Sequence, residues 1–304
     1  DDICSLQGIR DSHLNEKVLT ILKALLDLFK GKYKVCHVHS IWNPILTLFA
    51  IAAKLSGVKF VVSARGMLEP WVLSNSTCKK RLALRLYVWF LFKHSSVVIA
   101  SSEQEKLGIK KVFDIDHIEV ISNGYAGEIL HRKFVEYEGL AIIYFGRIDK
   151  KKGVDILLES VKKLEFEYVL RIVGCENQDC QDLSLEGANV EVYPFMDYNG
   201  LRELLLKSHV FVFPTWSENF GNSILEALAH GLFVITTKES SWWELNMSNG
   251  GMLVMNDSDS FLKAIGEYFA LSQTEKISLS RNASNHAKSH LMENLIDKWN
   301  AVYE

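Results

Sequence analysis

The sequence lacks the signatures of several common classes of protein. It carries no Gly-x-Gly-x-x-Gly motif and no P-loop, which argues against a dinucleotide-dependent dehydrogenase and against a P-loop nucleotide hydrolase. Its longest apolar runs, such as YVWFLF at 87–92, are far shorter than the roughly 20 residues that span a bilayer. No signal-peptide pattern opens the chain, so we expect a cytoplasmic protein.

Cysteine and excess charge are also scarce. The five cysteines are scattered and form no Cys-x-x-Cys pair, so we expect reduced thiols rather than a disulfide framework or a zinc site. The formal net charge is only −3, which argues against nucleic acid as a partner. A chain of 304 residues with 48% hydrophobic residues has room for about two domains with buried cores.

Short apolar runs alternate with amphipathic segments along the whole sequence. Strand-like runs occupy 34–40, 58–64, 95–101, 117–124, 140–146, 167–174, 188–195, 209–215 and 232–237. The helical pattern occupies 16–30, 43–57, 78–94, 103–108, 154–164, 199–208 and 222–231, and two or three helices close the chain. This alternation predicts an α/β protein with parallel sheets covered on both faces. Ligands of such sheets bind beyond the carboxyl ends of the strands, so the loops there are candidate sites.

The loop GRIDKKKG at 146–153 joins a predicted strand to a predicted helix. Arg147 offers a bidentate fork for a phosphate, and Lys152 offers a point charge. A solvated basic loop is the alternative interpretation.

A second loop, SENFGN at 217–222, leads into a helix that we expect to begin near Gly221 or Asn222. The N–H groups at a helix N-terminus favour an anion, and glycine allows its close approach. Glu218 and Glu226 are suited to accept hydrogen bonds from sugar hydroxyls. Together with the basic loop, these groups predict a nucleotide-diphosphate sugar as the ligand. The alternative is a capping role for Glu218 and a solvent-facing Glu226.

These motifs resemble those of the retaining GT-B glycosyltransferases of family 4. The family's E-x₇-E motif reads ENFGNSILE at 218–226, and its strand and basic loop read YFGRIDKKKG at 144–153. FMDYNG at 195–200 is similar to a further family turn, and Pro214 ends the preceding strand as in the family. The resemblance implies two Rossmann-like, doubly wound parallel-sheet domains that face a cleft.

The resemblance also implies roles for individual residues. Arg147, Lys152 and Glu218 would be catalytic, the first two by binding the donor diphosphate and the third by contacting the transferred sugar. Glu226 would bind the ribose. The full donor-binding set would be Gly146, Arg147, Lys152, Gly174, Met196, Glu218, Asn219, Phe220, Gly221, Asn222 and Glu226. Asn219 stands where the family usually has glycine.

The first half resembles the acceptor domain of family members from bacterial surface-polysaccharide pathways. HVHSIWNP at 37–44, VVSARGMLEPWVLS at 61–74 and ISNGYA at 121–126 carry this likeness. It makes His39, Asn43, Arg65 and Asn123 candidates for the acceptor cleft, although a satisfied buried histidine is the alternative for His39. The opening DDICSLQGIRDSH lacks the family's first strand and Gly-rich loop, so we expect an incomplete first domain.

The expected domains are 1–130 on the acceptor side, 131–286 for the donor, and a terminal helix at 287–304 that packs back on the first domain. The expected activity is metal-independent transfer of a sugar from a GDP- or UDP-linked donor to a glycan or lipid-linked acceptor in O-antigen, lipopolysaccharide, capsule or exopolysaccharide biosynthesis. No cofactor is expected, because the nucleotide sugar is a substrate.

The sequence raises two alternatives for the function and two interpretations of one segment. A truncated, non-catalytic relative would bind the nucleotide sugar without turnover. A metal-dependent GT-A enzyme would need an Asp-x-Asp motif, but DID at 114–116 and DSD at 257–259 follow no strong apolar strand. The basic, aromatic segment 78–94 suits either a buried domain helix or contact with an anionic membrane surface.

Overall fold

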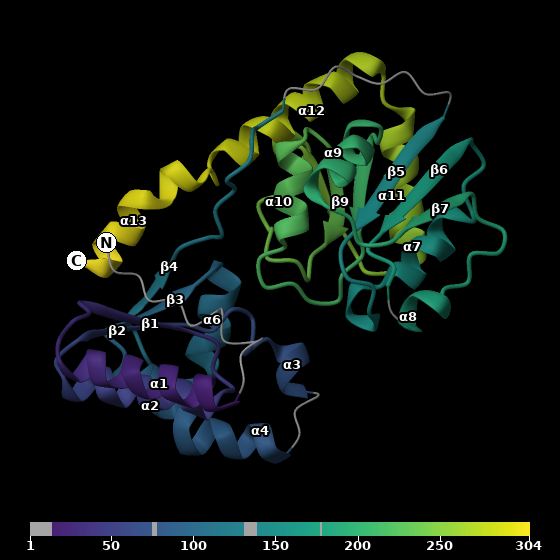
Figure 1. Cartoon of the computed structure of the whole chain (residues 1–304). Helices are drawn as coiled ribbons and strands as arrows, with labels where there is room; N and C mark the ends of the chain where they lie inside the picture. The colour runs from purple at the N-terminus through teal and green to yellow at the C-terminus, as the bar shows by residue number, and fades with distance from the viewer. Residues whose placement is uncertain (1–13, 75–77, 131–138, 177) are drawn as a thin grey trace. The chain divides into compact units, whose positions relative to one another are not determined.

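The computed structural model describes residues 14–74, 78–130, 139–176 and 178–304, and it divides the chain into two units (Figure 1). The first unit takes in the chain up to Ile121 together with Asp297–Glu304, and the second is Ser122–Ile296. The domain boundaries expected after residues 130 and 286 differ from this division, and they stay predictions.

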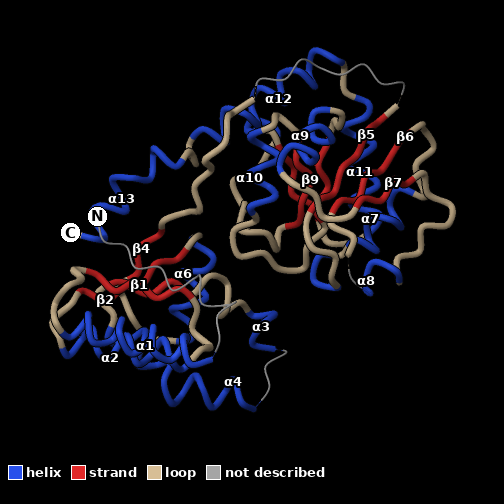
Figure 2. Tube along the Cα trace, viewed as in Figure 1, coloured by secondary structure: helices blue, strands red, loops and turns tan. Residues whose placement is uncertain are grey.

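The first unit is built on a parallel sheet of four strands in the order β1-β2-β3-β4. The strands are β1 (Val35–His39), β2 (Lys59–Ser63), β3 (Val97–Ala100) and β4 (Ile118–Val120). The helices are α1 (Leu14–Phe29), α2 (Pro44–Leu55), α3 (Pro70–Ser74), α4 (Cys78–Ala83), the π-helical turn η2 (Leu84–Val88), α5 (Trp89–His94), α6 (Glu103–Val112) and α13 (Ile296–Tyr303). Figure 2 shows the strands in red between these helices.

Side chains of this sheet alternate between two hydrophobic clusters, as strand geometry requires. Phe60 and Val62 of β2 pack into a large cluster with residues of α1, α2 and α5. Val61, between them, joins a smaller cluster that includes Ile99 of β3 and Val302 of α13. The C-terminal helix therefore covers part of the opposite face of the sheet.

The second unit is built on a parallel sheet of six strands in the order β10-β9-β8-β5-β6-β7. The strands are β5 (Leu140–Phe145), β6 (Tyr168–Val173), β7 (Val190–Tyr193), β8 (Val210–Phe213), β9 (Phe233–Thr237) and β10 (Gly251–Val254). The helices and helical turns are η3 (Lys150–Lys152), α7 (Val154–Val161), α8 (Gln178–Gln181), α9 (Tyr198–Leu206), α10 (Asn222–Ala229), η4 (Met247–Asn249), α11 (Ser258–Ala270), α12 (Gln273–Lys288) and η5 (Met292–Leu295). Helices lie on both faces of this sheet (Figure 1).

The central strands of the second unit are buried along their whole length. Every residue of β5, β8 and β9 is buried. The runs of β5 and β8 are hydrophobic without alternation, and β9 ends in two buried threonines. Continuous burial is expected where helices cover a parallel sheet on both sides. The sheet is therefore a rigid platform for the loops that leave its carboxyl edge.

Two details of the fold differ from the sequence-based expectation. The single helix expected at 78–94 is divided by the π-helical turn η2. Cys175 and Cys180 form a disulfide, so the expectation of reduced thiols throughout is wrong for this pair. The short loop between β6 and α8 brings their Cα atoms to 5.5 Å, within the range that a disulfide requires. Cys36 and Cys78 are free, and Cys4 lies outside the described residues.

Within the described part of the chain, no helix combines the length and the apolar content needed to cross a membrane.

Candidate functional site

The candidate site lies where the strand order of the second unit reverses. From β5 the chain proceeds to β6 and β7 on one side, and then to β8, β9 and β10 on the other. The loops after β5 and β8 therefore diverge from adjacent strands, and ligands of open α/β sheets bind in the crevice between such loops. These two loops are GRIDKKKG and PTWSENFGN, which the sequence analysis singled out.

The basic loop after β5 is fixed tightly against the loop after β8. Trp216 donates its backbone N–H to the carbonyl of Lys151 at 2.8 Å. Gly153 has a φ of 62° and lies so close to Pro214 that a Cβ there would stand 2.2 Å from the Pro214 carbonyl oxygen. Glycine is the residue that accepts both constraints. Lys152, the preceding residue, is consequently held in one place and is only 8% exposed.

Lys152 forms an ion pair with Glu218, 66 residues further along the chain. The Lys152 and Glu218 side chains are 10% and 14% exposed, and the ammonium also lies 4.9 Å from the ring centroid of Phe213. A partly buried pair of this kind is screened less than a surface pair. The acid and the base of the two motifs thus neutralise each other.

Hydrogen bonds from the loop after β9 hold the turn that precedes α10. The carbonyl oxygen of Phe220 accepts hydrogen bonds from the Trp242 indole N–H and, at 3.1 Å, from the Ser241 hydroxyl. Gly221 follows with a φ of 80°, and α10 begins at Asn222 as predicted. The N-terminal N–H groups of α10 and its dipole therefore face the loop side of the sheet, where an anion is favoured.

Two titratable groups beside the site have shifted pKa values. Burial raises the pKa of Glu226, which stands one turn into α10. Burial raises the pKa of Tyr144, and the charges of Asp149 and Glu218 raise it further. The neutral Tyr144 hydroxyl donates to the carbonyl of Arg147 at 2.7 Å, which fixes the backbone that carries the guanidinium.

These groups surround a cavity of about 800 Å³ that lies wholly within the second unit. A volume of this order is typical of small-molecule sites. Its lining consists of Phe145, Gly146, Arg147, Ile148, Asp149, Lys152, Val173, Gly174, Glu176, Phe195, Met196, Tyr198, Leu201, Phe213, Glu218, Gly221, Asn222, Ser223 and Glu226.

Most of the predicted donor residues lie in this lining, and two do not. Phe220 is 5% exposed and supports the turn from behind, while the Asn219 backbone N–H donates to Glu218 Oε1 at 3.2 Å. The lining also contains residues that were not predicted from the sequence, among them Asp149, Phe195 and Tyr198. Asp149 lies inside the quoted basic loop and Phe195 in the turn at 195–200, so their position after strands was the available signal.

The first-unit candidates lie at the carboxyl edge of the four-stranded sheet. His39 ends β1 and is exposed, so it is not the buried histidine of the alternative interpretation. Its ring lies tilted by 34° against that of His37, with centroids 3.9 Å apart. Desolvation and the charge of Arg65 lower its pKa. Arg65 follows β2 with a φ of 54°, an uncommon conformation for a residue other than glycine. Asn43 caps α2, because its side chain accepts from the Ile45 N–H at 3.0 Å.

Asn123, the fourth of these candidates, belongs to the second unit. Its side-chain amide donates to the Asn222 side chain at 2.8 Å, at the first residue of α10. This hydrogen bond links Asn123 to the start of α10, the helix that carries Glu226.

Both Asp-x-Asp sequences have structural roles. Asp116 forms an exposed ion pair with Lys110 at 2.9 Å. Asp257 caps α11 by accepting from the Ser260 N–H at 2.8 Å, and Asp259 pairs with Lys163 at 2.7 Å. Neither sequence contributes to the cavity lining.

The geometry defines a class of protein: two parallel-sheet α/β units, one with a cavity at its switch point that Arg147 and Lys152 help to line. Residues 9–124 match the family of glycosyl transferase 4-like domains, and residues 139–270 match the glycosyl transferases group 1. The chain belongs to the family 4 GT-B glycosyltransferases. The fold and family predicted from the sequence are therefore confirmed.

Individual relatives agree with this assignment. The chain is 28% identical over 266 residues to an uncharacterized 41.2 kDa protein from the cps region of Klebsiella pneumoniae, with 82% of this chain and 72% of that protein covered. It is 28% identical over 284 residues to the Escherichia coli UDP-Gal:alpha-D-GlcNAc-diphosphoundecaprenol alpha-1,3-galactosyltransferase, with 83% and 71% covered. Two further curated relatives are covered over only 33% and 39% of their lengths.

A solved structure shows the same fold. Anabaena HepE, determined with UDP and glucose, superposes with a TM-score of 0.75 at 19% identity, covering 95% of this chain and 82% of that one. The chain is thus a glycosyltransferase by family and by architecture.

Proposed function

We propose that the chain transfers a sugar from a nucleoside-diphosphate sugar, with retention of anomeric configuration, to a glycan or lipid-linked acceptor of bacterial surface polysaccharide. The observation that carries this proposal is the convergence of Lys152, Arg147 and the N-terminus of α10 on one cavity, with Glu218 and Glu226 beside them. Cationic groups and helix N–H groups suit a diphosphate, and the carboxylates suit sugar hydroxyls.

The chemistry follows from where charge develops as the glycosidic bond to phosphate breaks. Negative charge grows on the leaving diphosphate, and Arg147, Lys152 and the α10 N-terminus stabilise it there. These fixed positive groups supply the electrostatic help that a metal ion gives in other transferases, which supports metal-independent transfer. Glu218 is engaged by Lys152, which supports a sugar-positioning role rather than nucleophilic attack.

The base and the acceptor follow less directly from the geometry. Gly174, Met196 and Phe195 also line the cavity and would receive the base. The names of the relatives include both a UDP-galactose enzyme and a GDP-mannose enzyme, each acting on a polyprenyl-diphosphate-linked acceptor. We therefore retain UDP and GDP as donor nucleotides and a polyprenyl-linked glycan as the acceptor class.

Contact with a membrane surface would suit such an acceptor. Leu82, Leu86 and Trp89 are 57%, 68% and 48% exposed and recur at helical spacing across α4, η2 and α5. Arg81 and Arg85 are exposed on the same segment. An exposed apolar stripe beside basic residues is typical of helices that lie on anionic membranes.

A thermal-shift panel of UDP- and GDP-sugars tests the donor assignment. A ligand that binds only the folded state raises the unfolding temperature, so at least one nucleotide sugar should stabilise the chain. Incubation of that sugar with a polyprenyl-diphosphate-linked glycan, followed by NMR of the product's anomeric carbon, tests transfer and retention. Binding without turnover would indicate the non-catalytic relative, and the absence of any nucleotide shift would reject the site itself.

A further inference from the structure

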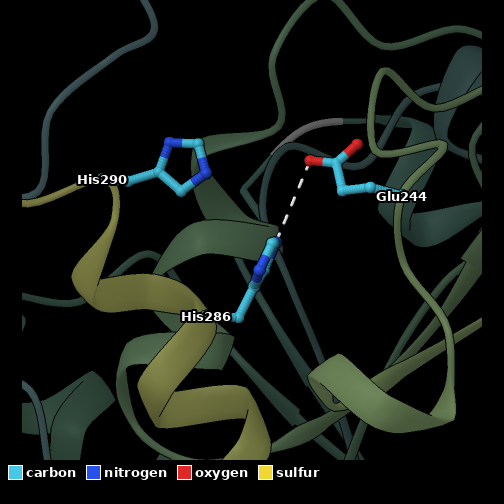
Figure 3. Close-up of side chains that lie close together, drawn as sticks. All are labelled: Glu244, His286 and His290. Carbon is cyan, nitrogen blue, oxygen red and sulfur yellow. Dashed lines mark ion pairs between the residues drawn. The ribbon is translucent and has the colours of Figure 1, made fainter.

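Three ligand-type side chains meet on the second unit outside the donor cavity (Figure 3). His286 lies near the end of α12, His290 follows one turn later, and Glu244 comes from the loop after β9. One ligand atom from each lies within 4.8 Å of the others. The His286 Nε2 and Glu244 Oε1 atoms are 3.9 Å apart, which is too long for a hydrogen bond.

The backbone holds these three side chains on one side of the helix end. Residues four apart lie above one another on a helix face, and the backbone N–H groups of Ser289 and His290 continue the turn by donating to His286 and Ala287. In Figure 3 both imidazole rings turn toward the Glu244 carboxylate.

The loop that carries Glu244 is braced by its own amides. The carbonyl oxygen of Glu244 accepts from the side chains of Asn246 and Asn249 at 2.9 and 2.7 Å, and these two asparagines form a reciprocal capping box around η4. The backbone under Glu244 is therefore fixed. Its side chain is 50% exposed and has room to swing toward the imidazoles.

The histidine nitrogens are arranged as metal ligands usually are. His290 Nδ1 lies 3.2 Å from the Ser122 hydroxyl, and a second partner of this kind orients a ligating imidazole. His286 Nε2 is buried and has no hydrogen-bond partner among the described residues. A buried polar atom left unpaired is costly, and a metal ion would satisfy it.

An aromatic wall backs the cluster. The Trp242 ring centroid lies 5.8 Å from that of His286 and 5.0 Å from that of His290. Trp242 is 1% exposed, so it shields one side of the cluster from water. The same indole holds the Phe220 carbonyl, and the Phe220 ring lies 5.8 Å from His290.

We propose that Glu244, His286 and His290 bind a divalent transition-metal ion, with zinc as the expected occupant. Zinc binds imidazole and carboxylate ligands, whereas magnesium and calcium prefer oxygen ligands. Ligand atoms around tetrahedral zinc stand about 3.4 Å apart. The cluster reaches that geometry by small side-chain rotations, with the exposed Glu244 carboxylate moving most.

The ion would stabilise the structure that supports the donor motif and would take no part in sugar transfer. None of its three ligands lines the donor cavity. It would join the end of α12 to the loop after β9, and that loop carries Trp242 and Ser241, which hold the Phe220 turn. Metal binding should therefore raise stability.

Equilibrium dialysis of the full chain against zinc, with the bound metal measured by mass spectrometry, tests the site. The wild type should retain about one zinc per chain, and His286→Asn and His290→Asn should each lower the affinity by at least about 100-fold, as expected when a ligand is lost. His94→Asn, a half-buried histidine of α5, is the matched control and should bind zinc like the wild type.

If the histidine variants fold poorly, Glu244→Gln still tests the proposal, because the Glu244 side chain is 50% exposed and its replacement leaves the packing intact. It should weaken zinc binding and abolish the zinc-dependent rise in unfolding temperature, while the thermal shift caused by a nucleotide sugar persists. Cobalt should give the visible bands of a tetrahedral site in the wild type and not in His286→Asn. Equal zinc binding by wild type, Glu244→Gln and His286→Asn, or no binding by the wild type, would overturn the assignment.

Discussion

At the scale of single residues, Lys152 is the buried cation of the candidate site and is paired with Glu218. It is buried, it ends the η3 turn, and its position is set by Gly153 and by the hydrogen bond from Trp216 to Lys151. Lysine is rarely buried unless it is paired. A fixed, buried ammonium at the wall of a cavity is therefore a credible electrostatic partner for a leaving diphosphate.

Lys152→Ala should weaken nucleoside-diphosphate binding by roughly 10- to 100-fold, since a charge-assisted hydrogen bond contributes about 1.5–3 kcal/mol. Isothermal titration with the donor nucleotide measures the change. Lys150→Ala removes an exposed lysine of the same turn and is the control, which should bind as the wild type does. Equal affinity of wild type and Lys152→Ala would remove Lys152 from the site.

Glu218→Ala should reduce kcat by about 10- to 100-fold while nucleotide affinity stays the same or rises. The carboxylate is proposed to position the transferred sugar, and its removal also frees the Lys152 ammonium for phosphate. Steady-state kinetics and nucleotide titration on the same preparation separate the two effects. A large loss of nucleotide affinity with unchanged kcat would reverse the assigned role.

Nucleotide affinity should fall as the pH drops through the raised pKa of Glu226. Burial raises this pKa, so the folded protein keeps the proton to a higher pH than the unfolded chain, and the group's contribution to stability declines as the pH rises. Nucleotide affinity should instead rise with pH, because the proposed contact with ribose hydroxyls needs the ionised carboxylate as acceptor. Titrations between neutral pH and the ordinary carboxyl range should show the loss in wild type.

Two variants complete the test of Glu226. Glu226→Gln should bind more weakly at neutral pH and lose this pH dependence, and Glu226→Ala should bind more weakly still. A pH profile that is the same for wild type and Glu226→Gln would assign the dependence to another group.

At the scale of elements, the adjacent loops after β5 and β8 create the site. Gly153 lies in close contact with the loop after β8, since a Cβ added to it would stand 2.2 Å from the Pro214 carbonyl oxygen. Any side chain at this position pushes the two loops apart. The alignment of Lys152 with Glu218 therefore depends on one glycine.

Gly153→Ala should destabilise the protein by about 2 kcal/mol or more, because the substitution combines a left-handed backbone conformation with a steric clash. Chemical denaturation measures the free energy of unfolding. Gly108→Ala is the control, since Gly108 lies in α6 with open space around its Cβ position, and alanine there should stabilise by about 0.5–1 kcal/mol. Similar effects of both substitutions would contradict the tight-contact argument.

The sequence predicted most of the second unit's elements because helical and strand periods alternate clearly there. The start of α10 at Asn222 was predicted from the glycine before it. Strand β10 was missed, since its run GMLV is short and lies at the sheet edge next to β9. The Lys152–Glu218 pair and the Cys175–Cys180 disulfide escaped prediction because both depend on how loops fold back, which no periodicity reports.

At the scale of the whole molecule, the two units differ in what they present to solvent. The second unit carries the donor cavity. The first exposes apolar side chains on its helices, including Leu48 and Leu55 of α2 at 52% and 73%. Contiguous exposed apolar residues mark interaction surfaces. The basic stripe of α4 and η2 next to such residues favours an anionic lipid surface.

The chain should sediment with vesicles that contain phosphatidylglycerol and remain free of vesicles of pure phosphatidylcholine. Arg85→Glu should weaken this binding by about 10-fold or more, as a basic residue near an anionic surface contributes about 1 kcal/mol. Arg281→Glu reverses an exposed arginine of α12 in the second unit and is the control. Equal sedimentation of the two variants would reject the stripe as a membrane contact.

The ion pair between Lys152 and Glu218 has a consequence for how the enzyme distinguishes fresh donor from spent product. At the proposed site, a nucleoside diphosphate would have to displace the Glu218 carboxylate from the Lys152 ammonium and would offer the carboxylate no new partner. An intact nucleotide sugar would bring hydroxyl groups that donate to the displaced carboxylate. We therefore expect this ion pair to weaken inhibition by the spent nucleotide relative to binding of the intact donor.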